Sequence, residues 1–370
     1  MNLPLEVAVV AAMVTSMAGT FLARSAALRF HWLDQPGHHK SHANPIPLLG
    51  GIAMYIAFLA SLLLSNSRAI LQEGTAVLIG ATLLLVVGAI DDRRGLSPRT
   101  KLLAQAGAAV LLVIGGAGIE VLPFAWMNLA ATILWVAAIC NAMNLLDNMD
   151  GLSAGVAAIA CAFFTLLALW HGQIWVSIVA AVLLGATLGF LRFNWNPATI
   201  FMGDAGSLLL GFLLAVLAIK LRFPSADPSR TWPIPLLVLA VPIFDTTLVI
   251  ISRLRRGVPI SSGGRDHVSH RLVRLGLGVR EAVATIYLVA ALCGGAAIAT
   301  LLLPSSTYVF ALVALIGLLG LAGLVLLERV DLSDSGQVAR SRRRLQATQL
   351  KMRNSGTIQH IGQEGTGRAG

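Results

Sequence analysis

Charged residues are scarce in this chain of 370 residues. Asp, Glu, Lys and Arg make up 12% of it, whereas a typical soluble domain contains about 25%. Hydrophobic residues make up 56%, and the mean hydropathy is +0.80. The composition excludes a soluble globular protein and indicates an integral membrane protein.

Cysteine is nearly absent as well. Cys140, Cys161 and Cys293 are widely spaced, and each lies inside an apolar stretch. This spacing excludes a disulfide framework and a thiolate metal site. We expect all three to be packing residues.

Apolar stretches recur along the chain, and a helix that spans a bilayer needs about 20 mostly apolar residues. The candidates are residues 3–23, 48–65, 75–90, 102–119, 122–140, 153–170, 173–191, 205–221, 233–251, 282–303 and 307–327. The first has no basic residues before it, so we interpret it as a retained span and not as a signal peptide. Because several candidates are short or rich in Gly, we expect an all-α polytopic bundle of about 10 to 11 transmembrane helices.

The basic residues predict how the chain is oriented. If the N-terminus lies outside, 23 of the 27 Lys and Arg fall in cytoplasmic segments, which is the distribution that the positive-inside rule favours. We therefore expect a multi-pass protein of the plasma (inner) membrane, with the N-terminus outside and the C-terminus cytoplasmic. The acid-rich segments described below then lie on the cytoplasmic side, where we expect the active site.

The net charge of +10 comes mostly from this asymmetry and from a basic C-terminal segment. The basic residues are not interleaved with aromatics, so a nucleic-acid partner is not expected. We expect a polytopic transmembrane catalytic domain over residues 1–330 and a basic, disordered cytoplasmic tail over residues 331–370. The tail is suited to contact anionic lipid headgroups of the bilayer.

Five of the 17 acidic residues lie at the ends of three apolar spans. They are Asp91, Asp92, Asp147, Asp150 and Asp204. Acids at a membrane boundary are costly and are usually functional. Carboxylate oxygens suit Mg²⁺, which keeps several waters and often binds substrate phosphates. The pattern predicts phosphate chemistry at a membrane surface with Mg²⁺, for which Mn²⁺ could substitute.

Two of these segments have an informative spacing. Asp91 and Asp92 are adjacent, so they could hold a metal ion or act as a base, because a neighbouring like charge raises one carboxyl pKa. The alternative is a helix end whose charges meet water. Asn144, Asp147 and Asp150 are three residues apart, so on a helix they share one face and form a polar ledge for a sugar, a ribose or a metal ion.

Basic and aromatic residues lie in the same predicted cytoplasmic loops. Lys40 is a candidate phosphate-binding cation, with a solvated charge near the membrane as the alternative. Phe201 could stack on a nucleobase, or it could be an interfacial anchor. Arg265, His267 and His270 lie in a Gly-rich loop that could supply cations to a diphosphate. In the same loop, Arg253, Arg255 and Arg256 are interpreted as orientation signals only.

Together, these segments resemble the polyprenyl-phosphate N-acetylhexosaminyl-1-phosphate transferases of glycosyltransferase family 4, in order and spacing from about Asp34 to Gly278. The resemblance implies a Mg²⁺-dependent enzyme that moves a sugar-1-phosphate from a UDP-sugar nucleotide to a polyprenyl phosphate lipid and releases UMP. It also implies a role at the first membrane step of cell-envelope polysaccharide or glycolipid synthesis.

The resemblance also implies residue roles. Asp91 and Asp92 are catalytic acids, one of which could deprotonate the lipid phosphate, His267 is a third catalytic residue, and Asp204 is the Mg²⁺ ligand. The implied substrate-binding residues are Lys40, Lys101, Asn144, Asp147, Asp150, Asn194, Phe201, Arg265 and His270.

The histidine loop discriminates between branches of this family. It reads His267-Val268-Ser269-His270, whereas the bacterial N-acetylglucosamine branch commonly reads His-Ile-His-His and the muramoyl-pentapeptide branch has three consecutive histidines. The loop therefore favours the undecaprenyl-phosphate N-acetylglucosaminyl-1-phosphate transferase branch, with UDP-N-acetylglucosamine as donor and undecaprenyl or decaprenyl phosphate as acceptor. Ser269 departs from the branch pattern.

Several alternatives stay open from the sequence. The donor could be another UDP-N-acetylhexosamine or UDP-N-acetylmuramoyl-pentapeptide, and transfer could take one step or two. A transporter of an anionic solute is the alternative of another class, but it would carry polar residues near mid-span and broken helices in paired halves. The oligomeric state is also open, with a homodimer among the alternatives.

Overall fold

The computed structural model describes residues 4–35, 44–64, 68–224, 226–330 and 332. This part of the chain is helical apart from one short antiparallel strand pair and the connecting loops, so the expected all-α fold is confirmed. The elements are α1 (Leu5–Arg29), β1 (Leu33–Asp34), β2 (Ile46–Pro47), α2 (Gly50–Leu64), α3 (Arg68–Arg94), α4 (Pro98–Ile114), α5 (Ala125–Leu146), α6 (Leu152–Trp170), α7 (Ile174–Asn194), α8 (Gly203–Lys220), α9 (Pro228–Thr231), α10 (Ile234–Val238), α11 (Ala240–Arg256), α12 (Val268–Leu275), α13 (Val279–Leu302) and α14 (Ser306–Glu328).

Each of the eleven predicted spans coincides with a helix or with the bent α10–α11 pair. Among the described residues, eight helices are long and apolar enough to cross a membrane. The segments Pro228–Val238 and Ala240–Arg256, bent by 67°, make a ninth if they form one span. Helix α2 is apolar but has only 15 residues, and α4 has 17 and begins with basic side chains. The number of full-length helices is lower than predicted because these elements are short or bent.

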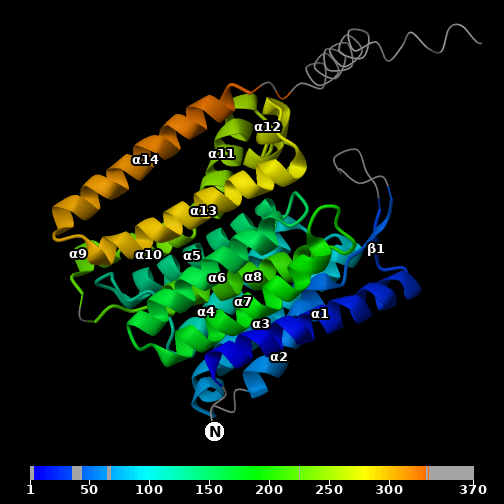
Figure 1. The fold of residues 1–370 in the computed structure, drawn as a ribbon, viewed down its shortest axis with the longest axis horizontal. Coiled ribbons are helices and arrows are strands. Elements are labelled where there is room, and N and C mark those ends of the chain that lie inside the picture. Colours follow the sequence, from blue (N-terminus) through cyan, green and yellow to red (C-terminus); the bar gives the residue numbers. More distant parts are fainter. Residues whose placement is uncertain (1–3, 36–43, 65–67, 225, 331, 333–370) are drawn as a thin grey trace, which may run out of the picture. The chain divides into compact units, whose positions relative to one another are not determined.

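Helix α8 is the most deeply buried span, with every side chain from Ala205 to Ile219 buried. It packs against α2, α3, α5, α6 and α7, and Figure 1 shows it in the middle of the bundle. Gly88 permits the close approach of α3, because a Cβ there would lie 2.5 Å from backbone atoms of Asp204 and Ala205. The last turn of α3 therefore lies beside the first turn of α8.

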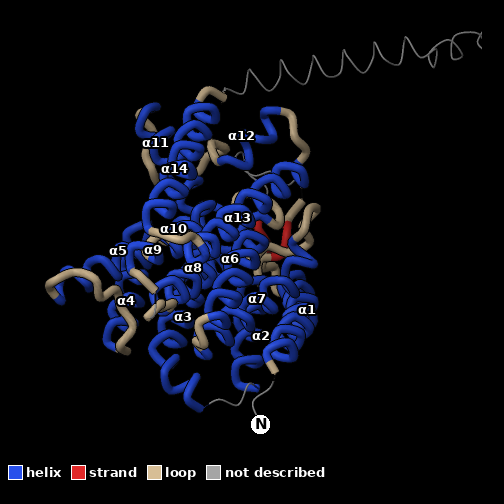
Figure 2. The backbone as a smooth tube through the Cα atoms, turned by 60° about the vertical axis from the view of Figure 1, so that its left-hand side comes forward, coloured by secondary structure: helices blue, strands red, loops and turns tan. Residues whose placement is uncertain are grey.

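The short strands hold the beginning of α2. β1 pairs with β2 through Leu33 opposite Pro47 and Asp34 opposite Ile46, and Figure 2 shows the pair in red. The backbone N–H of Phe201 donates to the Pro47 carbonyl at 2.8 Å, and the Phe201 carbonyl accepts from Gly50 at 3.0 Å. These bonds connect the α7–α8 loop to the chain segment that enters α2.

Two predictions fall outside the described residues. Lys40 lies in the segment 36–43, and the tail predicted over residues 331–370 is described only at Leu332. The domain boundary, the disorder of the tail and the orientation of the termini stay predictions.

Candidate active site

A cavity of about 500 Å³ opens where α3, α5 and α7 end and α8 begins. It gathers nine of the residues predicted to form the site, from segments far apart in the sequence. They are Asp91, Asp92, Asn144, Asp147, Asp150, Asn194, Phe201, Asp204 and His270. Asp34, which the sequence did not single out as a site residue, also lines the cavity. The predicted site residues Lys101, Arg265 and His267 are not among the lining residues.

Lys101 links two of the acids that line this cavity. Its ammonium group donates to Asp91 Oδ2 at 2.7 Å and to Asp204 Oδ2 at 2.9 Å. The Asp91 side chain is held from the other side by the backbone N–H of Leu96. A cation is thus already bound between carboxylates from α3 and α8.

Asn144 orients the second oxygen of Asp204. Its side-chain amide donates to Asp204 Oδ1 at 2.8 Å and to Ser207 Oγ at 2.9 Å. The first turn of α8 therefore presents the carboxylate in one fixed direction. Asn144, predicted to form part of a polar ledge, here orients the Asp204 carboxylate.

Asp92 binds the N-terminus of α8. Its carboxylate accepts from the backbone N–H groups of Asp204 at 2.7 Å and Ala205 at 3.2 Å, where unpaired N–H groups and the helix dipole favour an anion. Gly203, at φ +67°, leaves the space that the Asp92 carboxylate fills. Asp92 thus has a structural contact that the sequence did not reveal.

Asp147 has a different environment. Within the described residues, its carboxylate takes part in no ion pair or side-chain hydrogen bond, although it lines the cavity. Burial, followed by the negative charges of Asp204, Asp92 and Asp150, raises the pKa of Asp147 to about 8. This carboxyl can therefore take up or release a proton near neutral pH.

The raised pKa of Asp147 predicts how stability depends on pH. The folded protein keeps the Asp147 proton up to about pH 8, whereas an unfolded Asp loses it near pH 3.9. Stability should therefore fall as pH rises from about 4 to about 8. Asp147→Asn should remove this fall and raise the melting midpoint at pH 8 by roughly 2–4 °C, measured in detergent without divalent cations.

Asp150→Asn is the matched contrast for this measurement. Asp150 Oδ2 accepts from Asn196 Nδ2 at 2.9 Å and from the Ala198 N–H at 3.0 Å, so loss of its negative charge should weaken both bonds and lower the melting midpoint at pH 8 instead of raising it. If the melting midpoints of the wild type and of Asp147→Asn change with pH in the same way, the assignment of the raised pKa to Asp147 is contradicted.

Asn194, like Asp150, supports the loop between α7 and α8. The buried Asn194 side chain accepts from the Gly151 N–H at 3.0 Å and donates to the Ile200 carbonyl at 3.0 Å. Both ends of its amide are occupied, so Asn194 positions the cavity wall. Its predicted contact with the uridine stays a prediction.

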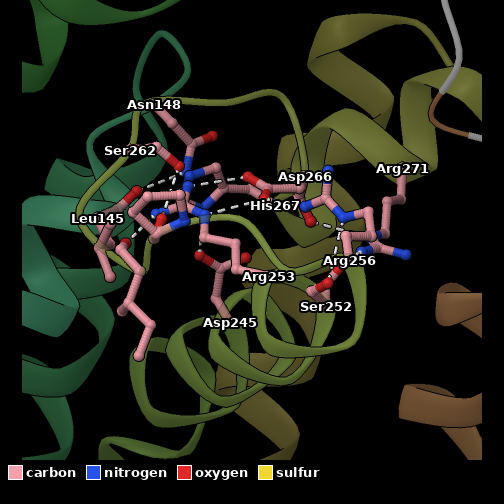
Figure 3. Close-up of polar contacts among 12 residues, drawn as sticks. Leu145, Asn148, Asp245, Ser252, Arg253, Arg256, Ser262, Asp266, His267 and Arg271 are labelled. Carbon is pink, nitrogen blue, oxygen red and sulfur yellow. Dashed lines mark hydrogen bonds and ion pairs between the residues drawn. The ribbon is translucent and has the colours of Figure 1, made fainter.

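The histidine loop is held by an acid that the sequence reading missed. His267 Nδ1 lies 2.8 Å from Asp245 Oδ2, and the Val268 N–H donates to Asp245 Oδ1 at 2.7 Å. Figure 3 shows the side chain of Asp245, on α11, pointing toward His267. Asp245 is buried. A lone acid inside an apolar span was the available signal, because such residues are usually functional.

The arginines of α11 show that one interpretation from the sequence was wrong. Arg253, taken as an orientation signal only, is buried and makes a bidentate pair with Asp266, at 2.9 Å from both Nε and Nη2. Arg256 adds a contact of 2.6 Å to the same carboxylate, and Arg271 Nε donates to the Asp266 carbonyl at 2.8 Å. Figure 3 shows this cluster beside His267. Although burial opposes it, hydrogen bonding and ion pairing with Arg253 hold the pKa of Asp266 at about 2.

His270, in the first turn of α12, lines the cavity. Burial, reinforced by the charges of His267 and Arg265, lowers the pKa of His270 to about 4. His270 is therefore neutral near pH 7 and acts as a hydrogen-bonding group, whereas the sequence suggested a cation. Ser269 is fully buried, and its hydroxyl donates to Asn148 Oδ1 at 2.5 Å.

The cavity is suited to Mg²⁺ by its donor atoms. In the described segments, no three His, Cys, Asp or Glu side chains converge into a closed metal site. However, Asp91 and Asp204 already share one cation, the Lys101 ammonium. Two carboxylates supply only part of the oxygen shell of a metal ion. This fits Mg²⁺, which takes one or two carboxylates and completes its shell with water and substrate phosphates.

The family model for glycosyl transferase family 4 matches residues 75–222. The chain is 36% identical over 292 residues to a Bacillus subtilis (strain 168) protein named "Probable undecaprenyl-phosphate N-acetylglucosaminyl 1-phosphate transferase", across 76% of this chain and 81% of the relative. It is 34% identical over 319 residues to the "Decaprenyl-phosphate N-acetylglucosaminephosphotransferase" of Mycolicibacterium smegmatis, across 76% and 78% of the two chains. It is 30% identical over 295 residues to the "Undecaprenyl-phosphate alpha-N-acetylglucosaminyl 1-phosphate transferase" of Yersinia pestis, across 75% and 79%.

Proposed function

The chain belongs to glycosyl transferase family 4, and on this premise we propose that it transfers N-acetylglucosamine-1-phosphate from UDP-N-acetylglucosamine to a polyprenyl phosphate and releases UMP. The observation that carries this proposal is the Asp91–Lys101–Asp204 cluster beside the cavity, at the ends of apolar helices. Relatives named for this reaction with both undecaprenyl and decaprenyl acceptors support the substrate class. The enzyme is a multi-pass membrane protein.

The basic residues of the sequence support a cytoplasmic active site. The cavity lies at the same helix ends as Arg93, Arg94 and Lys101, which the positive-inside rule favours on the cytoplasmic side. A soluble nucleotide sugar could reach the cavity from there, while the prenyl chain stays in the bilayer.

Phosphoryl transfer here joins two anionic substrates. An oxygen of the lipid phosphate attacks the β-phosphorus of the donor, and the bond to the bridging oxygen breaks, so that UMP leaves with that oxygen. Asp91 and Asp204 would hold Mg²⁺, which would supply positive charge to the diphosphate and to the leaving group. Lys101, already between these two carboxylates, is positioned to bind a phosphate oxygen and reduce the repulsion between the substrates.

A proton on the lipid phosphate must leave before or during the attack. Asp91 and Asp92 both accept hydrogen bonds, from Lys101 and from the α8 N-terminus respectively. Asp147 has a pKa of about 8 and no such partner among the described residues. A carboxylate without such a contact can accept a proton without breaking one, so we assign the proton to Asp147 and an anchoring role to Asp92.

Donor selectivity would come from the histidine loop. His270 and Gly264 line the cavity, and neutral His270 is suited to hydrogen-bond a sugar hydroxyl or N-acetyl group. A site that hydrogen-bonds its substrate rejects analogues that leave its polar groups unpaired. UDP-N-acetylglucosamine should therefore be preferred over UDP-N-acetylmuramoyl-pentapeptide by at least about a hundredfold in kcat/KM.

A donor panel tests this proposal. The purified protein is given undecaprenyl phosphate and each of UDP-N-acetylglucosamine, UDP-N-acetylgalactosamine and the muramoyl-pentapeptide donor, and UMP release is followed. Transfer from the muramoyl donor at an equal or higher rate would refute the branch. Failure of every donor would refute the reaction itself and favour a transporter.

A further inference from the structure

A second cavity, of about 420 Å³, lies where α1 and α7 end and α13 begins. It shares no lining residue with the acidic cavity. Arg24 of α1, Arg192 of α7 and Arg280 of α13 all line it. Helices α1 and α7 lie side by side in Figures 1 and 2. Three arginines from distant parts of the sequence thus line one space.

The positive charge of this cavity is not neutralised by the protein. Over the part of the chain that is described, no carboxylate pairs with Arg24 or Arg192, and none of the lining residues is acidic. The Nε atom of Arg24 is buried without a hydrogen-bond partner. Like charges brought together in this way are costly unless an anion accepts their hydrogen bonds.

The wall of the cavity is fixed in place. Asn196 connects the α7–α8 loop to α13 and to the turn between α5 and α6, because its carbonyl accepts from Arg280 Nε at 2.9 Å and its side-chain amide donates to Asp150 at 2.9 Å. The cavity therefore has a defined shape before a ligand arrives. A preorganised site loses less entropy on binding.

The surroundings indicate that the anion belongs to a lipid. Phe21 and Trp195 line the cavity and are 56% and 36% exposed, and aromatic side chains at span ends are typical of the headgroup region. The neighbouring Leu22 on α1 is 66% exposed and offers an apolar surface to an acyl chain. Basic pockets between transmembrane helices bind anionic headgroups.

We propose that this cavity is a binding site for the phosphate headgroup of an anionic phospholipid, with the acyl chains along α1. The three arginines hold the phosphate by charge-assisted hydrogen bonds. The site is separate from the catalytic cavity, so its occupation does not depend on the proposed reaction.

Lipid retention measured by native mass spectrometry tests the proposal. The full chain in neutral detergent is titrated with phosphatidylglycerol, with phosphatidylcholine of the same acyl chains, and with inorganic phosphate. Phosphatidylglycerol should bind at least about tenfold more tightly than phosphatidylcholine, and Arg24→Gln or Arg192→Gln should each weaken it about tenfold. Arg192→Lys should lose less, because the charge stays while the planar fork is lost.

Arg29→Gln is the matched control. Arg29 lies in the last turn of the same helix as Arg24 but does not line the cavity, so phosphatidylglycerol binding should be unchanged. If the arginines serve orientation only, all four variants will bind like the wild type, which would overturn the proposal. Equal affinity for both lipids would also overturn it, as would inorganic phosphate that displaces phosphatidylglycerol at similar concentration. Melting curves exclude unfolded variants.

Discussion

Asp204→Asn is expected to lower turnover by at least about a hundredfold while the protein stays folded. The substitution keeps an oxygen that can accept from Asn144, which binds Asp204 Oδ1 at 2.8 Å. It removes the negative charge that holds Lys101 at 2.9 Å and that would bind Mg²⁺. Initial rates of UMP release and melting curves of the purified variant measure the two effects separately. Asp91→Asn should behave in the same way, because it removes the other carboxylate bound to Lys101.

Asp227→Asn is the control for these variants. Asp227 caps the short helix α9 through a 2.9 Å bond from the Ser229 N–H, a contact that Asn can also make. Its activity should match the wild type. Near-normal turnover in both Asp204→Asn and Asp91→Asn would contradict the assignment of the acidic cavity as the active site.

Removal of divalent cations is expected to abolish transfer completely and reversibly. The cavity offers carboxylate and amide oxygens, which suit Mg²⁺ or Mn²⁺, and the diphosphate would otherwise meet the acids without a neutralising ion. Rates are measured in excess chelator and after Mg²⁺ or Mn²⁺ is added back. A melting curve in chelator shows that the fold is intact. Full activity in excess chelator would count decisively against a metal-dependent reaction.

Much of this site could be predicted because its residues break the pattern of their surroundings. Asp91, Asp92 and Asp204 stand out as charges at the ends of apolar spans, and such positions are costly unless they are used. The order of the spans then places these acids on one side of the membrane. They line one cavity because the end of α3 packs against the beginning of α8.

The remaining contacts depend on partners that the spacing of residues does not reveal. Asp245 lies in a bent span, three residues after Pro242, so its approach to His267 depends on how α11 packs. Arg253 resembles any basic residue at a helix end until Asp266 folds back onto it. The cap that Asp92 forms on α8 requires two helices separated by more than a hundred residues to pack through Gly88.

The fate of the donor's β-phosphorus tests the proposed reaction most directly. UDP-N-acetylglucosamine labelled at that phosphorus is incubated with the purified protein, undecaprenyl phosphate and Mg²⁺, and the lipid and aqueous products are separated. The label should enter the lipid in step with the release of UMP, because the sugar moves together with its phosphate. Label recovered in released UDP, with the sugar alone on the lipid, or no labelled lipid at all, would contradict the proposed transfer.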